Sequence, residues 1–319
     1  MNQVWVTGDA VVDLIPETDK TLLKCPGGAP ANVAVAIARL LGKSAFFGRV
    51  GNDPFGTFME VTLQNEGVNT ERLVKDPEQR TSTVVVDLDD QGERSFTFMV
   101  KPSADQFMSV DDIPEFKKNE WLHVCSISLA NEPSRSSTFE AIRRMKAAGG
   151  YISFDPNLRD EVWQDPSAIK SVVMQAVALA DVVKFSEEEL DFLTGSTSME
   201  QGLAHIGDLN NTLVLVTQGA KGVWRVFETQ GVLMSGRSVT PVDTTGAGDA
   251  FVGGLLAKLS QHDEWNNQQV VDSAIQWANG CGALATTQKG AMTALPTQED
   301  LTQFIQKNSS NTNAVKESV

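Results

Sequence analysis

Two hydrophobic periods alternate along most of the chain. Short apolar runs are typical of buried strands, and longer segments with apolar residues every third or fourth position are typical of helices. The pattern predicts strands at residues 4–8, 45–51, 122–126, 151–155, 182–185 and 212–217, and helices at residues 33–41, 55–66, 136–148, 168–180, 187–194, 250–259 and 270–286. This regular alternation implies an α/β fold with a doubly wound, mostly parallel sheet that carries helices on both faces.

Two β-hairpins interrupt the alternation, at residues 81–100 and 222–234. The first consists of two runs rich in β-formers around a polar turn that contains Gly92. A hairpin inserted in a strand–helix chain is a candidate lid, and the alternative is an extra antiparallel edge of the main sheet. As a lid it would present one face to a substrate or a partner, formed by Thr81, Thr83, Phe96 and Phe98.

The chain of 319 residues has no internal repeat or low-complexity linker. We expect a single domain over residues 1–307, with lid elements at about residues 10–26 and 80–101. Residues 308–319 are polar and are expected to form a disordered tail.

The net charge of the chain limits the kinds of ligand that it can bind. Acidic residues outnumber basic ones 41 to 26, the formal net charge is −15, and no stretch is rich in Lys and Arg, which argues against nucleic acid as a partner. An acidic protein that binds an anion must do so locally, through backbone amides and a bound cation.

Cysteine and histidine usage excludes several site classes. The three cysteines are far apart and lack C-x-x-C spacing, so the sequence predicts neither a disulfide framework nor a zinc site. With no signal-like start and no apolar run of 18 residues, we expect a cytoplasmic protein that does not contact a membrane. Three scattered histidines offer little for a His-based triad, so we expect catalysis by carboxylates.

Residues 242–251 place small residues directly before an acid at the start of an apolar helix. Gly246, Ala247 and Gly248 allow backbone N–H groups to approach an anion closely, and a helix N-terminus adds about +0.5 of elementary charge. Asp249 then lies in the first turn beside that anion. The segment is interpreted as an anion cradle with its own base, although these ten residues alone are also compatible with an ordinary helix start.

Further polar residues follow the predicted strands, and a doubly wound sheet brings such positions to one edge. They are Asp9 and Asp13, Gly27 and Gly28 with Asn32, Asp155 and Arg159, Lys184 with Glu187 and Glu189, Thr217 with Gly219 and Gly222, and residues 243–249. Singly, most of them also fit plain turns or helix caps; together they indicate one site.

Two signatures within this set, Gly27-Gly28-x-x-x-Asn32 and the segment from Asp243 to Asp249, lie about 215 residues apart. With them the chain resembles the ribokinase-like (PfkB) carbohydrate kinases over residues 3–305. The resemblance implies a Rossmann-like α/β domain with a small β-sheet lid. It also implies transfer of the γ-phosphate of ATP to a sugar hydroxymethyl oxygen.

The resemblance assigns the catalytic and sugar-binding positions. Asp249 corresponds to the general base, Gly246, Ala247 and Gly248 to the anion hole, and Arg159 is placed to add a cation at the transferring group. The implied sugar contacts are Asp13, Gly27, Gly28 and Asn32, with Asp9, Asp249 and the lid residues Phe98 and Phe96 as further contacts.

The resemblance also implies nucleotide and metal positions. ATP contacts are expected at Lys184, Glu189, Thr217, Gly219, Gly222, Gly248 and Asn279. Glu189 would order the waters of Mg²⁺, although Ser186 replaces the Asn of the family's Asn-x-x-Glu motif, which leaves the role of Ser186 open. A K⁺ site is expected from oxygens of Asp243, Thr245, Ala285, Gln288 and Gly290.

Within the family, the stretches 8–13 and 155–159 are most similar to fructokinases and aminoimidazole riboside kinases. Fructose is therefore the expected acceptor, giving fructose 6-phosphate, and an aminoimidazole riboside or another nucleoside or sugar is the alternative. A regulator that binds sugar and nucleotide without turnover is the non-enzymatic alternative. The resemblance also favours a homodimer formed through the lid.

Overall fold

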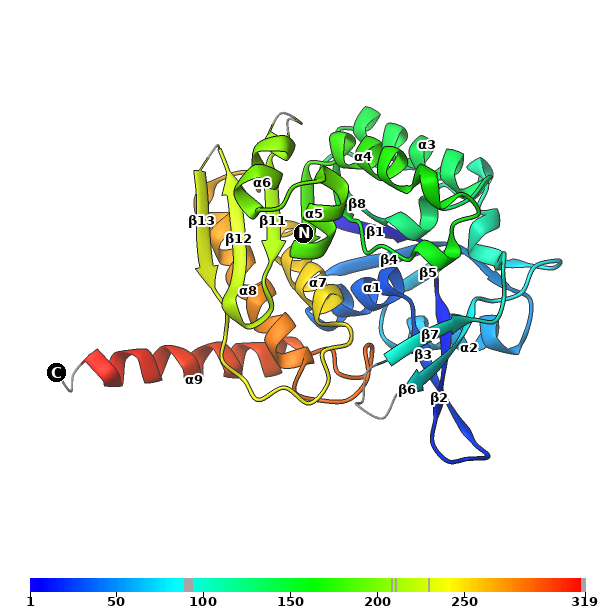
Figure 1. Cartoon of the computed structure of the whole chain (residues 1–319), viewed down its shortest axis with the longest axis horizontal. Coiled ribbons are helices and arrows are strands. Elements are labelled where there is room, and N and C mark those ends of the chain that lie inside the picture. The colour runs from blue at the N-terminus through cyan, green and yellow to red at the C-terminus, as the bar shows by residue number, and fades with distance from the viewer. Residues whose placement is uncertain (89–93, 208, 210, 229, 317–319) are drawn as a thin grey trace.

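A computed structural model describes residues 1–88, 94–207, 209, 211–228 and 230–316 of the chain. Its main feature is a nine-stranded sheet in the order β13-β12-β11-β10-β9-β8-β1-β4-β5 (Figure 1). The strands from β5 to β11 are all parallel to their neighbours, while β12 and β13 are antiparallel. The strands are β1 (Gln3–Thr7), β4 (Lys43–Gly51), β5 (Asn69–Asp76), β8 (Trp121–Cys125), β9 (Tyr151–Asp155), β10 (Val182–Ser186), β11 (Leu213–Thr217), β12 (Gly222–Phe227) and β13 (Gln230–Ser235).

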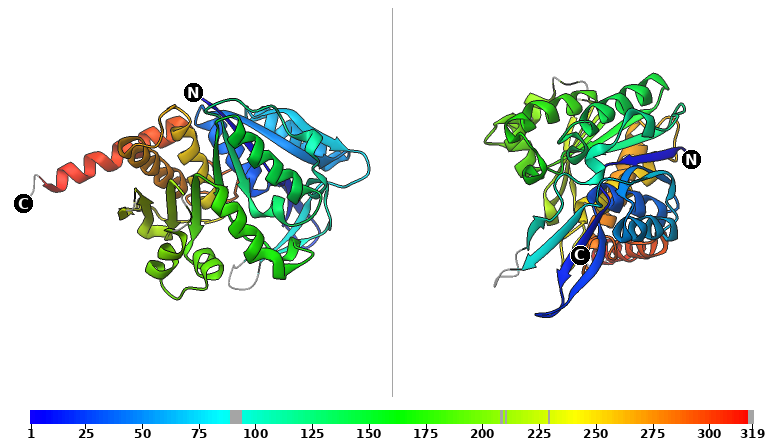
Figure 2. Two further views of the ribbon diagram at one scale, coloured as in Figure 1. Left: turned by 90° about the horizontal axis from the view of Figure 1, so that it is seen from above. Right: turned by 90° about the vertical axis from the view of Figure 1, so that its right-hand side faces the viewer.

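Helices cover both faces of this sheet, as the alternation predicts (Figure 2). The α-helices are α1 (Ala29–Arg39), α2 (Pro54–Asn65), α3 (Ser134–Ala147), α4 (Ile169–Leu179), α5 (Glu187–Thr194), α6 (Met199–Gly207), α7 (Ala247–Leu259), α8 (Gln268–Ala285) and α9 (Gln298–Lys316). One hydrophobic core contains residues of α1, α2, α7 and α8, and the other contains residues of α3 to α6. Val182 and Val183 of β10 belong to different cores because successive strand residues point to opposite faces.

The hairpin at residues 81–100 belongs to a second sheet, so the lid prediction is confirmed. This sheet has the order β3-β2-β6-β7 and projects from the body of the molecule (Figures 1 and 2). Its strands are β2 (Val11–Pro16), β3 (Leu22–Gly27), β6 (Thr83–Leu88) and β7 (Arg94–Phe98). The predicted turn residues 89–93 lie outside the described residues.

The prediction that Thr81 and Thr83 share one face of the lid with Phe96 and Phe98 is wrong. In the β6–β7 register Val84 pairs with Phe98 and Val86 with Phe96, so these valines share the aromatic face. Thr83 is one residue out of step, and the side-chain period of two puts it on the opposite face. Thr81 is buried and donates its Oγ1 hydrogen bond to Asp53 Oδ1 over 2.8 Å. The threonines therefore anchor the lid to the body and do not face a substrate.

Helix α9 covers most of the C-terminal region. It is assigned from Gln298 to Lys316, and residues 317–319 lie outside the described residues. The helix starts at a reciprocal cap, in which Thr297 N donates to Asp300 Oδ2 and Asp300 N donates to Thr297 Oγ1. Leu301 is buried in the core, and the rest of the helix follows from this anchored first turn.

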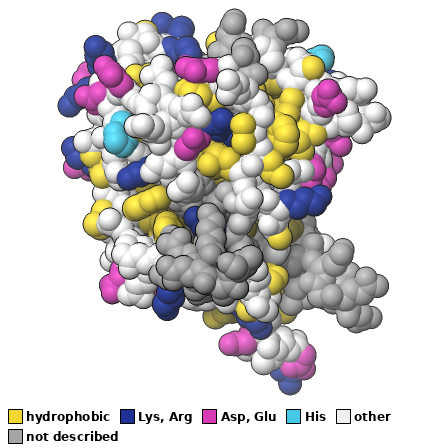
Figure 3. Space-filling view, turned by 90° about the vertical axis from the view of Figure 1, so that its left-hand side faces the viewer, with side chains coloured by type: hydrophobic (Ala, Val, Ile, Leu, Met, Phe, Trp, Pro, Cys, Tyr) yellow, Lys and Arg dark blue, Asp and Glu magenta, His cyan; other side chains and the backbone are white. Residues whose placement is uncertain are grey.

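Charged side chains of both signs are mixed on the surface. On the face drawn in Figure 3, Lys and Arg side chains are scattered among Asp and Glu and form no continuous basic surface. Among the helices of the described residues, none has both the length and the apolar character needed to cross a membrane.

Candidate active site

The candidate site lies where strand order reverses, between β1 and β8, at the carboxyl ends of the parallel strands. A cavity of about 220 Å³ opens there. Most of the predicted sugar-binding and catalytic positions line it: Asp9, Asp13, Gly28, Asn32, Phe98, Arg159, Gly246, Gly248 and Asp249. Phe96 lines it too, so β7 covers the cavity with both of its aromatic side chains.

Gly27 and Gly28 connect β3 to α1 at the wall of this cavity. A Cβ at Gly27 would overlap the Asp13 carboxylate, and one at Gly28, where φ is +95°, would lie 2.7 Å from Asp9 O. Only glycine allows this close approach. The pair therefore lets β2 and α1 bring Asp13 and Asn32 to the same cavity.

Asp249 connects the two sequence signatures. Asn32 Nδ2 donates a hydrogen bond to Asp249 Oδ2 over 2.8 Å, between residues 217 positions apart. Asp249 lies in the first turn of α7, behind the left-handed Gly246 that caps the helix. Burial raises its pKa to about 6, with a contribution from Asp155, while Asn32, Lys184 and Arg159 oppose the shift. The carboxylate is thus ionised at neutral pH and has a higher proton affinity than an exposed Asp.

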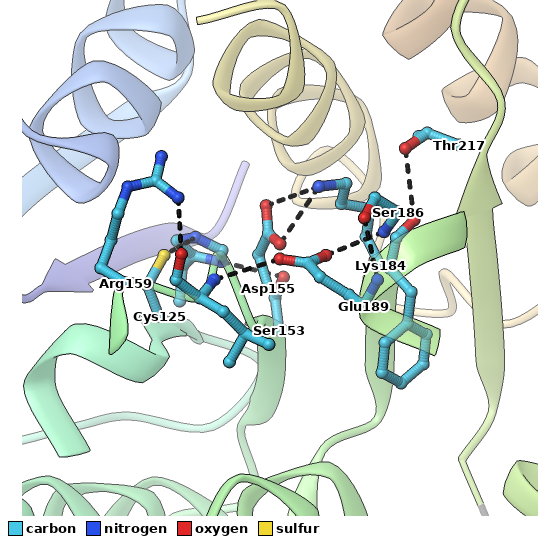
Figure 4. Close-up of polar contacts among 11 residues, drawn as sticks. Cys125, Ser153, Asp155, Arg159, Lys184, Ser186, Glu189 and Thr217 are labelled. Atoms are coloured by element: carbon cyan, nitrogen blue, oxygen red, sulfur yellow. Dashed lines mark hydrogen bonds and ion pairs between the residues drawn. The ribbon is translucent and has the colours of Figure 1, made fainter. Parts of the chain in front are cut away.

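Lys184 and Asp155 form a buried ion pair near the N-terminus of α7 (Figure 4). Lys184 Nζ lies 3.1 Å from Asp155 Oδ2, and a Cβ added at Gly248 would be 3.5 Å from the same Nζ. Burial alone would lower the pKa of Lys184, but Asp155, Glu189 and Asp249 outweigh it and raise the pKa. Lys184, predicted as an ATP contact, lines the sugar-side cavity and holds a positive charge at the start of α7.

Glu189 and Ser186 form a capping box at the start of α5 (Figure 4). Ser186 N donates to Glu189 Oε2 over 2.8 Å and Glu189 N donates to Ser186 Oγ over 3.1 Å. Glu189 Oε1 also accepts from Leu158 N over 3.2 Å. Burial, with a contribution from Asp155, raises the pKa of Glu189. Ser186 therefore serves as the helix cap, and it fixes Glu189 beside Lys184 and Asp155.

Arg159 stands apart from this cluster in Figure 4. Its side chain is exposed at the cavity wall, and Nη1 donates to Leu158 O over 2.7 Å. The guanidinium forms no ion pair with a carboxylate among the described residues. A positive charge is therefore available to an anion at the mouth of the cavity.

A second cavity, of about 460 Å³, lies on the other side of the α7 N-terminus. Five of the predicted ATP contacts line it: Thr217, Gly219, Gly222, Gly248 and Asn279. Gly246 lines only the first cavity, Ala247 only the second, and Gly248 lines both. Ala247 N donates a hydrogen bond to Thr244 O over 3.2 Å. Gly248 is thus the point where two bound ligands would meet.

The sequence interpretation missed the segment 236–241 and several apolar residues that line the second cavity. Arg237 is the single Lys or Arg among the described residues that line it, and none of the hydrogen bonds or ion pairs between described residues involves its side chain. The sequence could have indicated Arg237 as a ligand contact, because it lies between a predicted hairpin and the signature that begins at Asp243.

The residues expected to bind K⁺ come together only in part. Asp243 Oδ1 accepts from Thr245 N over 3.0 Å, and Asp243 Oδ2 accepts from Gly290 N over 2.8 Å. Val242 N and Asp243 N donate to Thr286 O, which brings the end of α8 and Ala285 near this turn. Gln288 is not joined to this group by any side-chain hydrogen bond between described residues. Among the described residues, no cluster of three or more His, Cys, Asp or Glu could hold a metal by itself.

Comparison with known proteins gives the class of protein. Residues 1–298 match the model of the pfkB family carbohydrate kinases, and the chain belongs to this family. The family resemblance seen in the two signatures is therefore confirmed, together with the α/β fold and its small lid sheet.

Particular relatives narrow the comparison further. The chain is 80% identical over 305 residues to the fructokinase of Vibrio alginolyticus, covering 96% of this chain and 99% of that one. The structure of Vibrio cholerae O395 fructokinase in its fructose-, ADP- and calcium-bound form has 66% identity and a TM-score of 0.92, and covers 95% of this chain and 99% of that chain. A double mutant of that enzyme was solved with fructose, ADP and potassium. The aminoimidazole riboside kinase of Salmonella typhimurium is 42% identical over 97% of each chain.

Proposed function

We propose that the chain is an ATP-dependent fructokinase that phosphorylates the 6-hydroxyl of fructose. The observation that carries the proposal is the position of Asp249. Its carboxyl group accepts a hydrogen bond from Asn32 and lines a cavity large enough for a sugar. This cavity meets the second cavity at Gly248. A hydroxyl in the first cavity and a nucleotide in the second would face each other across the N-terminus of α7. The high identity to fructokinases supports fructose over a riboside.

Asp249 is the general base in this proposal. As the hydroxyl oxygen attacks the γ-phosphorus, Asp249 Oδ accepts the hydroxyl proton, and the phosphorus–oxygen bond to ADP breaks. The pKa of about 6 keeps the carboxylate ionised at neutral pH while raising its affinity for that proton. Asn32 holds the carboxyl group in a fixed orientation.

Charge on the transferring group is balanced from several sides. The amides at Gly246 and Gly248 lie at a helix N-terminus, with Gly248 central because it borders both cavities, while the Ala247 amide already donates to Thr244 O. Lys184 lies beside Gly248, and Arg159 stands at the mouth of the first cavity. In a chain with a net charge of −15, these local cations and dipoles make the binding of phosphate possible.

Metal ions complete the proposed site. Mg²⁺ bound to the nucleotide neutralises phosphate charge, and Glu189, fixed by the α5 cap, would accept hydrogen bonds from its waters. K⁺ would be bound by oxygens at Asp243, Thr245, Ala285, Gln288 and Gly290. Thr245 N and Gly290 N donate to the Asp243 carboxylate and so bring these three residues together. The potassium-bound form of the V. cholerae enzyme supports this assignment.

ADP release, measured with fructose, ribose, aminoimidazole riboside and adenosine as acceptors, tests the proposed function. We expect fructose to give the highest kcat/KM, with fructose 6-phosphate as the product. Preference for the riboside would reassign the substrate. Calorimetric binding of fructose and ATP without release of ADP would identify a non-enzymatic regulator instead.

We also infer that the lid forms a homodimer. Leu22 and Leu23 of β3 are 50% and 51% exposed, and Phe96 of β7 is 40% exposed. Because successive strand residues point to opposite faces, Leu22 and Leu23 expose apolar groups on both faces of the open lid sheet, and a second lid would cover one of these faces.

A further inference from the structure

Ala291 lies against the start of α7 and beside the lid, and it has no role in the mechanism above. It belongs to residues 290–293, in the connection between α8 and α9. A Cβ added at Gly246, the left-handed cap of α7, would be 2.9 Å from Ala291 Cα and 3.0 Å from Ala291 Cβ. These distances leave no room for a side chain at Gly246, so the backbone of the cap rests directly on Ala291.

Hydrogen bonds hold the segment that carries Ala291 on both sides of this residue. Before it, Gly290 N donates to Asp243 Oδ2 over 2.8 Å, which ties the segment to the turn that leads into α7. After it, Arg39 of α1 donates from Nη1 to Leu295 O over 2.6 Å. The segment therefore supports the α7 cap from a fixed position.

The lid approaches Ala291 from the other side. A cavity of about 30 Å³, large enough to hold a water, lies between the lid and residues 290–293. Four residues line both this small cavity and the sugar cavity, namely Asp13, Phe96, Thr245 and Ala291. Ala291 therefore borders the lid, the sugar cavity and the α7 cap at once.

The lid register shows how a bound sugar would act on this junction. Val84 and Phe98 pair across β6 and β7, and both line the sugar cavity. Val86 and Phe96 form the next pair on the same face, and both line the small cavity above Ala291. A sugar bound under the first pair therefore fixes the position of the second pair over Ala291.

We propose that Ala291 is a positioning residue that couples the lid to the amides at the start of α7. A sugar holds the lid over Ala291, and Ala291 holds Gly246, so that the amides of Gly246 and Gly248 are ordered for phosphate. Coupling between two ligands is reciprocal, so a nucleotide at α7 should tighten the binding of the sugar by the same factor. This inference rests on the proposed function, because it takes a sugar and a nucleotide as the ligands of the two cavities.

Calorimetric titration with the non-hydrolysable ATP analogue adenylyl imidodiphosphate tests the coupling. The sugar ligand is 6-deoxyfructose, which lacks the reacting hydroxyl. In the wild-type protein, 6-deoxyfructose should lower the Kd of the ATP analogue at least about fivefold, and the analogue should lower the Kd of the sugar equally.

Three substitutions at Ala291 separate coupling from simple packing. Ala291→Gly removes the methyl group, so the coupling should fall below about twofold and kcat should fall about fivefold, while the Kd of the ATP analogue alone changes less than about twofold. Ala291→Ser keeps a Cβ of the same size and should retain the coupling. Ala291→Val overfills the junction and should raise KM for fructose roughly tenfold, with KM for ATP little changed.

Thr293→Ala is the matched control. Thr293 lines the same small cavity, but it does not line the sugar cavity, and its Oγ1 donates to Lys289 O over 3.0 Å. The substitution should leave the coupling between the two ligands as it is in the wild-type protein.

Absence of coupling in the wild-type protein, full coupling in Ala291→Gly, or an equal loss of coupling in Thr293→Ala would overturn the role of Ala291. Each of these outcomes can occur in an active fructokinase. Failure of the wild-type protein to release ADP with fructose would instead reject the proposed function.

Discussion

Asp249 shows how one buried contact sets the chemistry of a residue. The residue is 9% exposed, and its carboxyl group accepts a hydrogen bond from Asn32, which fixes the orientation of the group at the sugar cavity. The raised pKa makes it a stronger base than an exposed Asp and still leaves it ionised at neutral pH. The local environment of Asp249 therefore gives it a raised affinity for a proton and still leaves it ionised at neutral pH, so that it can accept one.

Asp249→Asn should lower kcat by about 10²–10⁴-fold, because the isosteric amide cannot accept the proton. KM for fructose and ATP should change by less than about threefold. In the wild-type protein, kcat should fall as the pH drops through about 6, since protonation of Asp249 removes the base. Steady-state kinetics over pH 5–8 check both expectations, and near-normal turnover of the variant would exclude Asp249 as the base.

We expect the positive charge of Arg237 to contribute to ATP binding in the second cavity. Arg237→Ala should raise KM for ATP roughly tenfold, with kcat little changed, because it removes the one cationic side chain lining that cavity among the described residues. Lys221→Ala is the control, since Lys221 lies in the adjoining turn but does not line the cavity. Equal effects of the two substitutions would show that only the general surface charge matters.

Helix starts and strand ends place the side chains that form the candidate active site. The start of α7 separates the two cavities, the cap of α5 fixes Glu189, and β7 carries Phe96 and Phe98 over the sugar cavity. Rigid elements thus set the distances on which phosphoryl transfer depends.

The α5 cap predicts a difference between two substitutions at Ser186. Ser186→Ala should cost about 1 kcal/mol in the free energy of unfolding because a helix N–H loses its acceptor, while Ser186→Asn should be near neutral since Asn is also a good N-cap. Chemical denaturation measures the stability of both. Equal destabilisation by Asn and Ala would contradict the capping role.

The lid register predicts opposite results for neighbouring residues of β7. Phe98→Ala should raise KM for fructose roughly tenfold and leave KM for ATP unchanged, because Phe98 lines only the sugar side among the two substrate cavities. Thr97→Ala should change neither, since Thr97 is exposed and points to the other face of the strand. A change in KM for fructose with Thr97→Ala would mean that the lid closes in another register.

At the scale of the whole molecule, the exposed lid predicts the oligomeric state. Size-exclusion chromatography with light scattering should give twice the 34.5 kDa of one chain. Replacing Leu22 and Leu23 by Lys should yield monomers, because the apolar lid surface would then carry charge. Leu233→Lys, at an exposed position of β13 in the main sheet, should leave the dimer intact. A monomeric wild-type protein would reject the lid interface.

Several features of the molecule were accessible from local sequence. The alternation of strands and helices predicted the doubly wound sheet, because burial on both faces imposes a short-range hydrophobic period on each element. The two signatures predicted residues of the cavity wall only in combination and through the family resemblance, because each one singly also fits an ordinary turn or helix start. Edge strand β5 was missed because its polar sequence, NTERLVKD, lacks the apolar run of a central strand.

Other features depend on contacts between distant parts of the chain. The hydrogen bond from Asn32 to Asp249, the position of Lys184 beside Gly248 and the place of Arg237 in the second cavity all depend on residues that no local pattern relates. Sequence alone determined the elements and the residue types at the sheet edge, since both follow from local periodicity and backbone chemistry. Only the tertiary structure decided which side chains meet and how deeply they are buried, because both depend on contacts between residues that are far apart in the sequence.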